Sequence, residues 1–195
     1  PLVFLSATYD VLVVQSAGNL QTMGPAPYIG IKERLDAGKP YPTYLSEPSS
    51  RIANPAQSLQ ALTVGSIAYG DFQQDDWSTF GQEDGHPSSF SRSGPGIWNV
   101  IKPEVVEYGG DDCRTSNNPV EVRAGAIAGA CPELVRSTMY PPGPAYDRDA
   151  IGTSFAAPKV ARIAALLQLY YRMNLPCCIV HSSSNPRAGP NGPTG

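Results

Sequence analysis

A helical segment near the C-terminus places the tightest constraint on how this 195-residue chain can fold. Residues 154–173 have the periodicity of an α-helix. The apolar members of that period are Ala156, Val160, Ile163, Ala164, Leu167 and Tyr171. Small residues dominate the first turns, so the helix can lie close against a sheet, and Pro176 is expected to end it.

Two upstream segments are typical of buried strands. Residues 11–14 form an unbroken apolar run, and residues 59–68 carry Leu62, Val64 and Ile67. Continuous β-branched runs suit strands that are buried on both faces of a parallel sheet. Together with a short helix at 31–37 and a strand or pair of turns at 100–108, they predict an α/β fold.

The polar turn at residues 16–19 is a candidate active-site edge. It follows the first apolar run at once, and ligands of open α/β sheets lie at the carboxyl ends of the strands. By contrast, the acidic residues within 69–95 are expected to form a solvated loop. These acids are Asp71, Asp75, Asp76, Glu83 and Asp84. A calcium site is the alternative, but the Asp-x-Asp-x-Asp-Gly spacing is absent.

Composition argues against several classes of function. The net charge of −3 gives no basic footprint for nucleic acid, and no apolar run approaches the ~20 residues that span a bilayer. The four cysteines include no Cys-x-x-Cys pair, which leaves a zinc site with little support. A disulfide between Cys113 and Cys131 and free thiols both remain open. The 19 glycines and 20 prolines predict long loops.

The segment Gly-Thr-Ser-Phe-Ala-Ala-Pro at 152–158 carries the strongest chemical signal. A serine at the N-terminus of a buried helix lies beside free backbone N–H groups, which favour negative charge and can help to bind an oxyanion. An ordinary helix cap is the alternative reading of the spacing alone. The segment, however, resembles the nucleophile motif of the subtilisin family of serine peptidases. That resemblance implies that Ser154 attacks the scissile carbonyl, although Lys159 and Arg162 stand where many members have histidine and glycine.

The turn Ser-Ala-Gly-Asn at 16–19 is a second match to the same family. The resemblance implies that the side-chain amide of Asn19 donates to the tetrahedral oxyanion, with the backbone N–H of Ser154 as the second donor. Such a donor is typically worth about 3–4 kcal/mol of barrier. It also implies that Ser16, Ala17 and Gly18 form part of the wall of the primary specificity pocket.

Three further segments, at 62–66, 90–96 and 101–110, are similar to scaffold elements of the family and follow in its order. They imply a three-layer subtilisin-like fold with a mostly parallel sheet. In this family the triad aspartate and histidine precede the oxyanion asparagine. Only 18 residues precede Asn19, and they contain no histidine. Asp10, His86 and His181 lack the expected sequence contexts.

The resemblance therefore implies an incomplete domain. Residues 1–180 are expected to be the C-terminal portion of a subtilisin-like peptidase domain whose N-terminal strands are missing, and residues 181–195 a disordered tail. Alone, the chain is expected to be inactive and marginally stable or aggregation-prone, because a strand edge is left unpaired. The expected partners are a polypeptide substrate and the missing N-terminal part of the same domain.

Two functions follow from this interpretation. The first is a serine endopeptidase fragment that hydrolyses peptide bonds through an acyl-enzyme on Ser154. The second is a catalytically dead domain that binds peptides or partners. A serine esterase is disfavoured, because Ala156 stands where Gly-x-Ser-x-Gly needs glycine. No cofactor is expected; many subtilisin-like enzymes bind structural calcium, but no ligand set can be mapped onto this chain.

Overall fold

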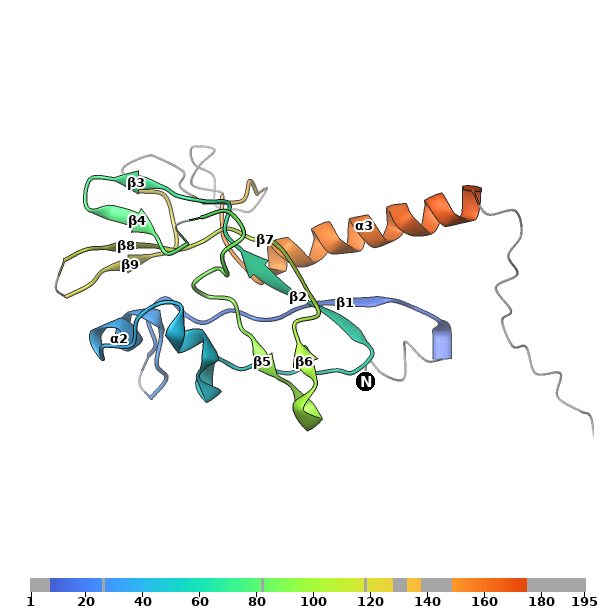
Figure 1. The fold of residues 1–195 in the computed structure, drawn as a ribbon, viewed down its shortest axis with the longest axis horizontal. Helices are drawn as coiled ribbons and strands as arrows, with labels where there is room; N and C mark the ends of the chain where they lie inside the picture. Colours follow the sequence, from blue (N-terminus) through green and yellow to red (C-terminus); the bar gives the residue numbers. More distant parts are fainter. Residues whose placement is uncertain are drawn as a thin grey trace, which may run out of the picture.

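The centre of the protein is a three-stranded parallel sheet covered by one long helix. The computed structural model describes residues 8–25, 27–81, 83–117, 119–127, 133–137 and 149–174. Strands β1 (Val13–Ser16), β2 (Ala61–Ile67) and β7 (Val105–Tyr108) lie in the order β1-β2-β7. Helix α3 (Thr153–Asn174) packs on all three strands (Figure 1). The predicted α/β class is confirmed.

Small side chains let α3 approach the sheet closely. Ala156 and Ala157 are buried against Val64 of β2, and Val14 and Val160 pack beside them. A larger residue at either alanine would push the helix away, since core packing has almost no free volume. This contact places the N-terminus of α3 beside the carboxyl end of β1, where the sequence predicted an active-site edge.

The first strand differs from its prediction. It begins at Val13 rather than Val11, because its pairing with β2 begins at Val13 and Ala61. Val11 and Leu12 are 50% and 57% exposed, and all four β1 residues are only half-buried. The half-buried side chains differ from the full burial that the apolar run suggested. Among the described residues β1 is an edge strand with one neighbour, as expected for a strand whose other edge is left unpaired.

The second half of α3 also lacks its expected cover. Ile163, Leu167 and Tyr171 were expected to face a core, but they are 46%, 52% and 57% exposed. Figure 1 shows the reason: the sheet lies under the first turns, and the helix runs on past its edge. The expected helix end at Pro176 and the predicted tail fall outside the described residues.

A second, antiparallel sheet was not predicted. Its order is β3-β4-β8-β9. These strands are β3 (Gln73–Gln74), β4 (Trp77–Thr79), β8 (Cys113–Thr115) and β9 (Val122–Arg123). Strands of two or three largely polar residues leave no periodicity long enough to read from sequence. The five acidic residues of the 69–95 segment are exposed, as expected for a solvated loop.

The connection from β1 to β2 contains α2 (Ile31–Asp36) and the 3₁₀ turns η1 (Thr43–Ser46) and η2 (Pro48–Ser50). The helix expected at 31–37 is thus confirmed. Ile31 and Tyr44 join Phe80 and Phe90 in the largest buried apolar cluster. Leu20 belongs to the same cluster, so the cluster anchors the chain segment that follows Asn19.

The proline-containing segment at 100–108 forms two strands. Strand β6 (Ile101–Lys102) pairs with β5 (Gly94–Pro95) around η3 (Ile97–Asn99), and β7 follows. The buried Lys102 donates from Nζ to the carbonyl of Ala61 at 2.8 Å and pairs with Glu104. Glu104 in turn accepts from the N–H of Thr63 at 2.8 Å. These bonds fix the start of β2, as a scaffold segment would. No helix among the described residues is long and apolar enough to cross a membrane.

Candidate active site

Asn19 and Thr153 lock together two segments that are 134 residues apart. The Oδ1 atom of Asn19 accepts from the backbone N–H of Thr153 at 3.0 Å and from its hydroxyl at 2.9 Å. The same hydroxyl accepts from the N–H of Gly18 at 3.1 Å. Because both bonds hold Oδ1, the amide group of Asn19 has a fixed orientation. Its Nδ2 atom is left to face the Ser154 side.

Gly152 lies between the side chains of Asn19 and Ser154. A Cβ atom placed on Gly152 would lie 3.0 Å from Asn19 Nδ2 and 3.1 Å from Ser154 Oγ. The two polar atoms therefore both border the position that a side chain at residue 152 would fill. Gly152 has φ +153°, a conformation that side chains rarely adopt. Glycine is thus required at this position both by the backbone and by these two neighbouring atoms.

Ser154 is exposed in the first turn of α3. Its own N–H has no acceptor among the described residues, whereas the next N–H, of Phe155, donates to the carbonyl of Gly152 at 2.9 Å. A free N–H in the first turn adds to the positive end of the helix dipole. Asn19 Nδ2 and the N–H of Ser154 are therefore two donors without an acceptor among the described residues, and the first of them lies beside the Ser154 hydroxyl.

No base contacts Ser154 in the described part of the chain. Ser154 Oγ has no hydrogen-bond partner there. His86 is half exposed and its ring lies 3.8 Å from Glu83, and Asp10 is exposed at the start of the chain. His181 is not among the described residues. That none of these three residues activates Ser154 therefore stays a prediction.

The three residues expected to form the specificity wall differ in exposure. Ala17 is fully buried against Ile52 and Ala56, while Ser16 and Gly18 are half-buried. Gly18 has φ +95°, and the Cδ atom of Arg92 lies 3.1 Å from where its Cβ would be. The N–H of Arg92 also donates to the carbonyl of Gly18 at 3.1 Å. Arg92 therefore packs on the wall.

Thr153 and Arg92 were not predicted as site residues. Thr153 lies inside the Gly-Thr-Ser motif, and this position was the only sequence signal for it. The structure shows that its hydroxyl is fully buried at the helix N-terminus, where it binds another segment. Arg92 lies in the segment 90–96, interpreted as scaffold. Its guanidinium contacts come from loops far apart in sequence, which no local pattern reveals.

The unusual Lys159 has partners that explain its presence. Its Nζ atom donates to the hydroxyl of Tyr69 at 2.7 Å and to the carbonyl of Tyr108 at 2.8 Å. The two tyrosine rings stack with centroids 4.4 Å apart, and the ammonium lies 5.2 Å from the Tyr69 ring centre. Lys159 thus ties α3 to the end of β7. Arg162 is exposed, so its bulk does not disturb the helix–sheet contact.

Three buried acids lie behind the site and were not singled out by the sequence. They are Asp111, Asp112 and Glu133. Asp112 accepts from the Thr22 hydroxyl at 3.3 Å, which connects this group to the segment that leads away from Asn19. Among the described residues, no group of three or more His, Cys, Asp or Glu is arranged to hold a metal ion. Cys113 is buried on β8, and the other cysteines lie outside the described ranges.

Comparison with known proteins identifies the family. Residues 4–176 match the model of the Subtilase family (Peptidase_S8). The chain belongs to the subtilase family. One relative is the uncharacterized protein y4bN of Sinorhizobium fredii (strain NBRC 101917 / NGR234), which is 35% identical over 114 residues. That match covers 54% of this chain and 24% of y4bN, so the matched region is about a quarter of the relative. No solved structure matches the subtilase chain.

Replacing Thr153 tests the lock on Asn19. Thr153→Val keeps the shape but removes the hydroxyl that binds Oδ1 of Asn19 and the N–H of Gly18. Lost hydrogen bonds of this kind cost about 1 kcal/mol each, so we expect the two together to lower kcat by up to roughly 30-fold, with little change in KM, in the protein expressed from its whole reading frame. Thr153→Ser restores the hydroxyl and should restore kcat. Equal losses in both variants would contradict a positioning role.

Proposed function

We propose that this subtilase segment carries the nucleophile and the oxyanion donors of a serine endopeptidase, which hydrolyses peptide bonds through an acyl-enzyme on Ser154. The observation that carries the proposal is that Ser154 Oγ and Asn19 Nδ2 converge beside Gly152, where glycine alone keeps a side chain from coming between them. Donors aimed at the place where negative charge develops are commonly the largest electrostatic contribution to acyl transfer. The fixed Oδ1 of Asn19 supports this role, because it leaves Nδ2 free to donate.

In the proposed reaction, Ser154 Oγ attacks the substrate carbonyl carbon and loses its proton to a base. The carbonyl oxygen becomes an oxyanion and accepts from Asn19 Nδ2 and the Ser154 N–H. Collapse of this intermediate breaks the C–N bond, the amine leaves with a proton, and the acyl group stays on Ser154. Water then releases the acid by the reverse sequence. We assign the base and its aspartate to a part of the same domain outside this chain.

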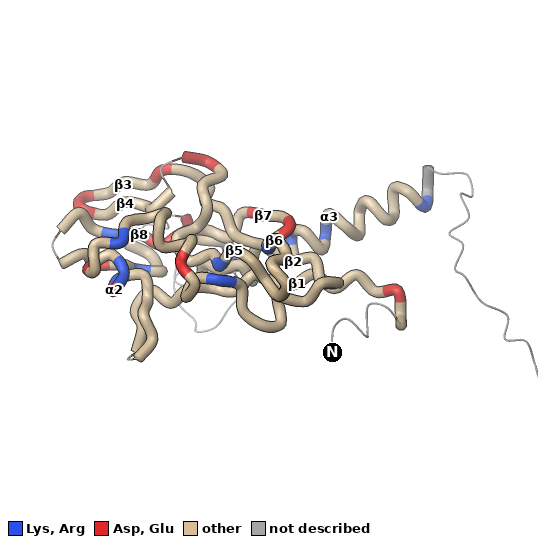
Figure 2. The backbone as a smooth tube through the Cα atoms, turned by 60° about the horizontal axis from the view of Figure 1, so that its bottom comes forward, with Lys and Arg blue, Asp and Glu red and all other residues tan. Residues whose placement is uncertain are grey.

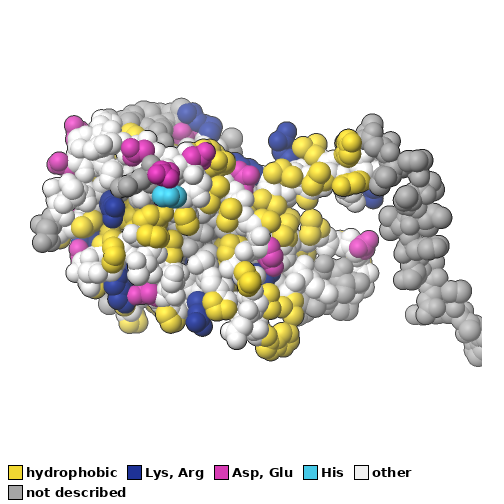
Figure 3. All heavy atoms as spheres, viewed as in Figure 1, with side chains coloured by type: hydrophobic (Ala, Val, Ile, Leu, Met, Phe, Trp, Pro, Cys, Tyr) yellow, Lys and Arg dark blue, Asp and Glu magenta, His cyan; other side chains and the backbone are white. Residues whose placement is uncertain are grey.

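The uncovered apolar surface supports that assignment. A hollow of about 690 Å³ lies between the segment that leads into β1 and the middle of α3. Most of its lining is apolar, with Asp10 and Gln168 as polar members, and it is formed by Asp10, Val11, Leu12, Val14, Ala161, Ala164, Ala165 and Gln168. Between Arg162 and Arg172, α3 carries no charged residue, which Figure 2 shows as an uninterrupted tan stretch. Figure 3 shows apolar side chains along this stretch and a gap beneath it. A covering layer of further strands from the same domain fits such a surface.

The test is covalent labelling. We expect a fluorophosphonate probe to modify the protein expressed from its whole reading frame, and the modified peptide to be the one with Ser154. Ser154→Ala should abolish labelling and reduce peptide hydrolysis by at least about 10³-fold, since the covalent route is lost. Labelling at another residue, or full activity of Ser154→Ala, would refute the proposal.

A catalytically dead, peptide-binding domain is the second candidate. The absence of any base beside Ser154 in the described part of the chain favours it. The same experiment separates the two candidates. A folded protein from the whole reading frame that binds peptides, but is neither labelled nor hydrolytic, would be the dead domain.

A further inference from the structure

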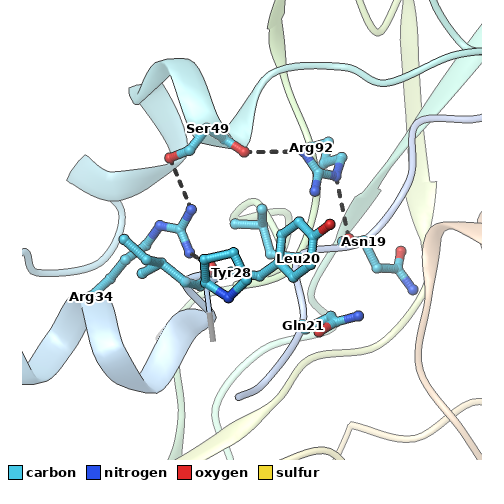
Figure 4. A pocket seen from close by; sticks show the side chains of 9 residues that line it. Asn19, Leu20, Gln21, Tyr28, Arg34, Ser49 and Arg92 are labelled. Atoms are coloured by element: carbon cyan, nitrogen blue, oxygen red, sulfur yellow. Dashed lines mark hydrogen bonds between the residues drawn. The ribbon is translucent and has the colours of Figure 1, made fainter. Parts of the chain in front are cut away.

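A pocket of about 400 Å³ opens directly beside Asn19 (Figure 4). Its polar lining comes from Asn19, Gln21, Arg34, Ser49 and Arg92, and the Tyr28 ring forms part of its apolar wall. Two guanidinium groups contribute to this lining, but no Asp or Glu does. Pockets of this size hold side chains or small ligands through a few placed polar groups. The pocket therefore favours an anionic occupant.

Arg92 carries a charge without a counter-ion. Its Nε donates to the Asn19 carbonyl at 3.3 Å, and its Nη1 donates to the Ser49 and Arg51 carbonyls at 3.1 and 3.0 Å. All three acceptors are neutral, and Arg92 forms no ion pair with a described residue. Its Nη2 donates to none of them either. Burial and the nearby charge of Arg34 lower the pKa of Arg92. The guanidinium is thus rigidly held, partly buried and electrostatically unsatisfied.

Arg34, in contrast, has a counter-ion in Glu47, which it shares with Lys39. Its Nη2 donates to the Ser49 hydroxyl at 2.9 Å, and its Nε lies 3.5 Å from a carboxylate oxygen of Glu47. The other nearby acid, Glu33, accepts from the N–H groups of Gly24 and Gly30. Neither acid is therefore available to Arg92. Figure 4 shows Ser49 between the two arginines, with Arg92 on the Asn19 side.

We propose that Arg92 selects a substrate with an acidic side chain immediately before the scissile bond, so that the enzyme cleaves after glutamate. This inference rests on the proposed function. Arg92 binds the backbone of Asn19, whose side chain faces Ser154, and it packs on Gly18. Ser16, Ala17 and Gly18 do not line this pocket themselves, so Asn19 and Arg92 are the residues that connect it to the expected specificity wall. A carboxylate in the pocket would reach the unused Nη2. Guanidinium–carboxylate hydrogen bonds are charge-assisted and directional, so a neutral amide of the same shape binds more weakly.

The experiment compares two quenched peptides that differ only in Glu or Gln at P1, with a Leu peptide as a reference for general damage. The protein is expressed from its whole reading frame. We expect kcat/KM to be about 10- to 100-fold higher for Glu than for Gln. Arg92→Gln should bring that ratio close to one, and Arg92→Lys should retain part of it. Arg51→Gln is the matched control, because exposed Arg51 does not line the pocket, and its ratio should not change.

Each outcome bears on a separate claim. If Arg92 acted only as a structural clamp, Arg92→Gln would lower the rates for the Glu, Gln and Leu peptides in equal proportion. That result would refute the role of Arg92 in selecting glutamate. A wild-type Glu/Gln ratio near one, or a Glu preference only after the scissile bond, would overturn it as well. In those cases Ser154 would still be labelled and peptides still cleaved. Loss of labelling and of all cleavage would refute both the proposed function and this inference.

Discussion

We expect Gly152→Ala to reduce kcat by at least about 10²- to 10³-fold, the usual cost of losing an oxyanion donor. The new methyl group would lie 3.0 Å from Asn19 Nδ2 and 3.1 Å from Ser154 Oγ, in the space proposed for the substrate oxygen. It would also strain the backbone, because φ at this residue is +153°. The measurement is kcat for peptide hydrolysis together with the rate of fluorophosphonate labelling.

Gly125→Ala is the control for that change. No atom of a described residue lies within 4 Å of a Cβ added to Gly125, and its φ is not in the region reserved for glycine, so activity should be preserved. Thermal unfolding of both variants separates a blocked site from a collapsed fold. If Gly152→Ala stays folded and retains more than about a tenth of wild-type kcat, the space beside Gly152 is not where the oxyanion forms.

The central architecture could be predicted because it rests on local apolar patterns. The run of small residues after Ser154 specifies a helix that packs tightly, and the segment around Val64 specifies a buried strand. Both are present, and they bring Ser154 and Asn19 together as the motifs implied. The start of β1 could not be predicted in the same way, because Val11 and Leu12 are as apolar as Val13, the first residue that pairs with β2. Pairing with a neighbour, rather than residue type, sets that boundary.

The chemistry around the site was harder to predict, because it depends on contacts between distant segments. The Thr153 hydroxyl matters through Asn19 and Gly18, and Arg92 matters through Asn19, Ser49 and Arg51. Each of these bonds joins residues more than 40 positions apart. Spacing rules describe one helix face or one strand and contain no information on such pairs. The second half of α3 shows a different limit of sequence patterns. Its apolar period predicts buried side chains, but no described residue packs against them and they are exposed.

The buried pair Asp111 and Asp112 shares one hydroxyl, that of Ser89. Its Oγ lies 2.7 Å from an oxygen of Asp111 and 2.8 Å from one of Asp112. A hydroxyl donates only one proton, so two ionised carboxylates cannot both be satisfied. Burial raises the pKa of Asp111 as well, but Asp111 accepts from the N–H groups of Gly81, Ser89 and Asp112, which lower it again. Among the described residues, the Asp112 carboxyl hydrogen-bonds only with the hydroxyls of Thr22 and Ser89. Asp112 is therefore the protonated member: it donates to Ser89, which donates to Asp111.

This arrangement makes stability depend on pH. Burial and the Asp111 charge raise the pKa of Asp112 to about 7, against 3.8 as its ordinary value. Between these values the folded protein holds a proton that the unfolded chain has lost. The free energy of unfolding should therefore fall as pH rises from about 4 to about 7, and then level off. About 1.4 kcal/mol per pKa unit sets a ceiling of about 4 kcal/mol for this group. Burial likewise raises the pKa of Glu133 to about 7, which adds a slope of the same sign.

Asp112→Asn should remove the Asp112 contribution. The amide of asparagine can donate to Ser89 and accept from Thr22 at every pH, as the protonated carboxyl does. We expect the variant to match the wild type near pH 4, to exceed its thermal midpoint at pH 8, and to show a shallower slope between them. Asp111→Asn should instead destabilise the protein at all these pH values, because its amide group would face N–H donors. Melting curves of the two variants that shift in the same direction at pH 8 would contradict the assignment of the proton to Asp112.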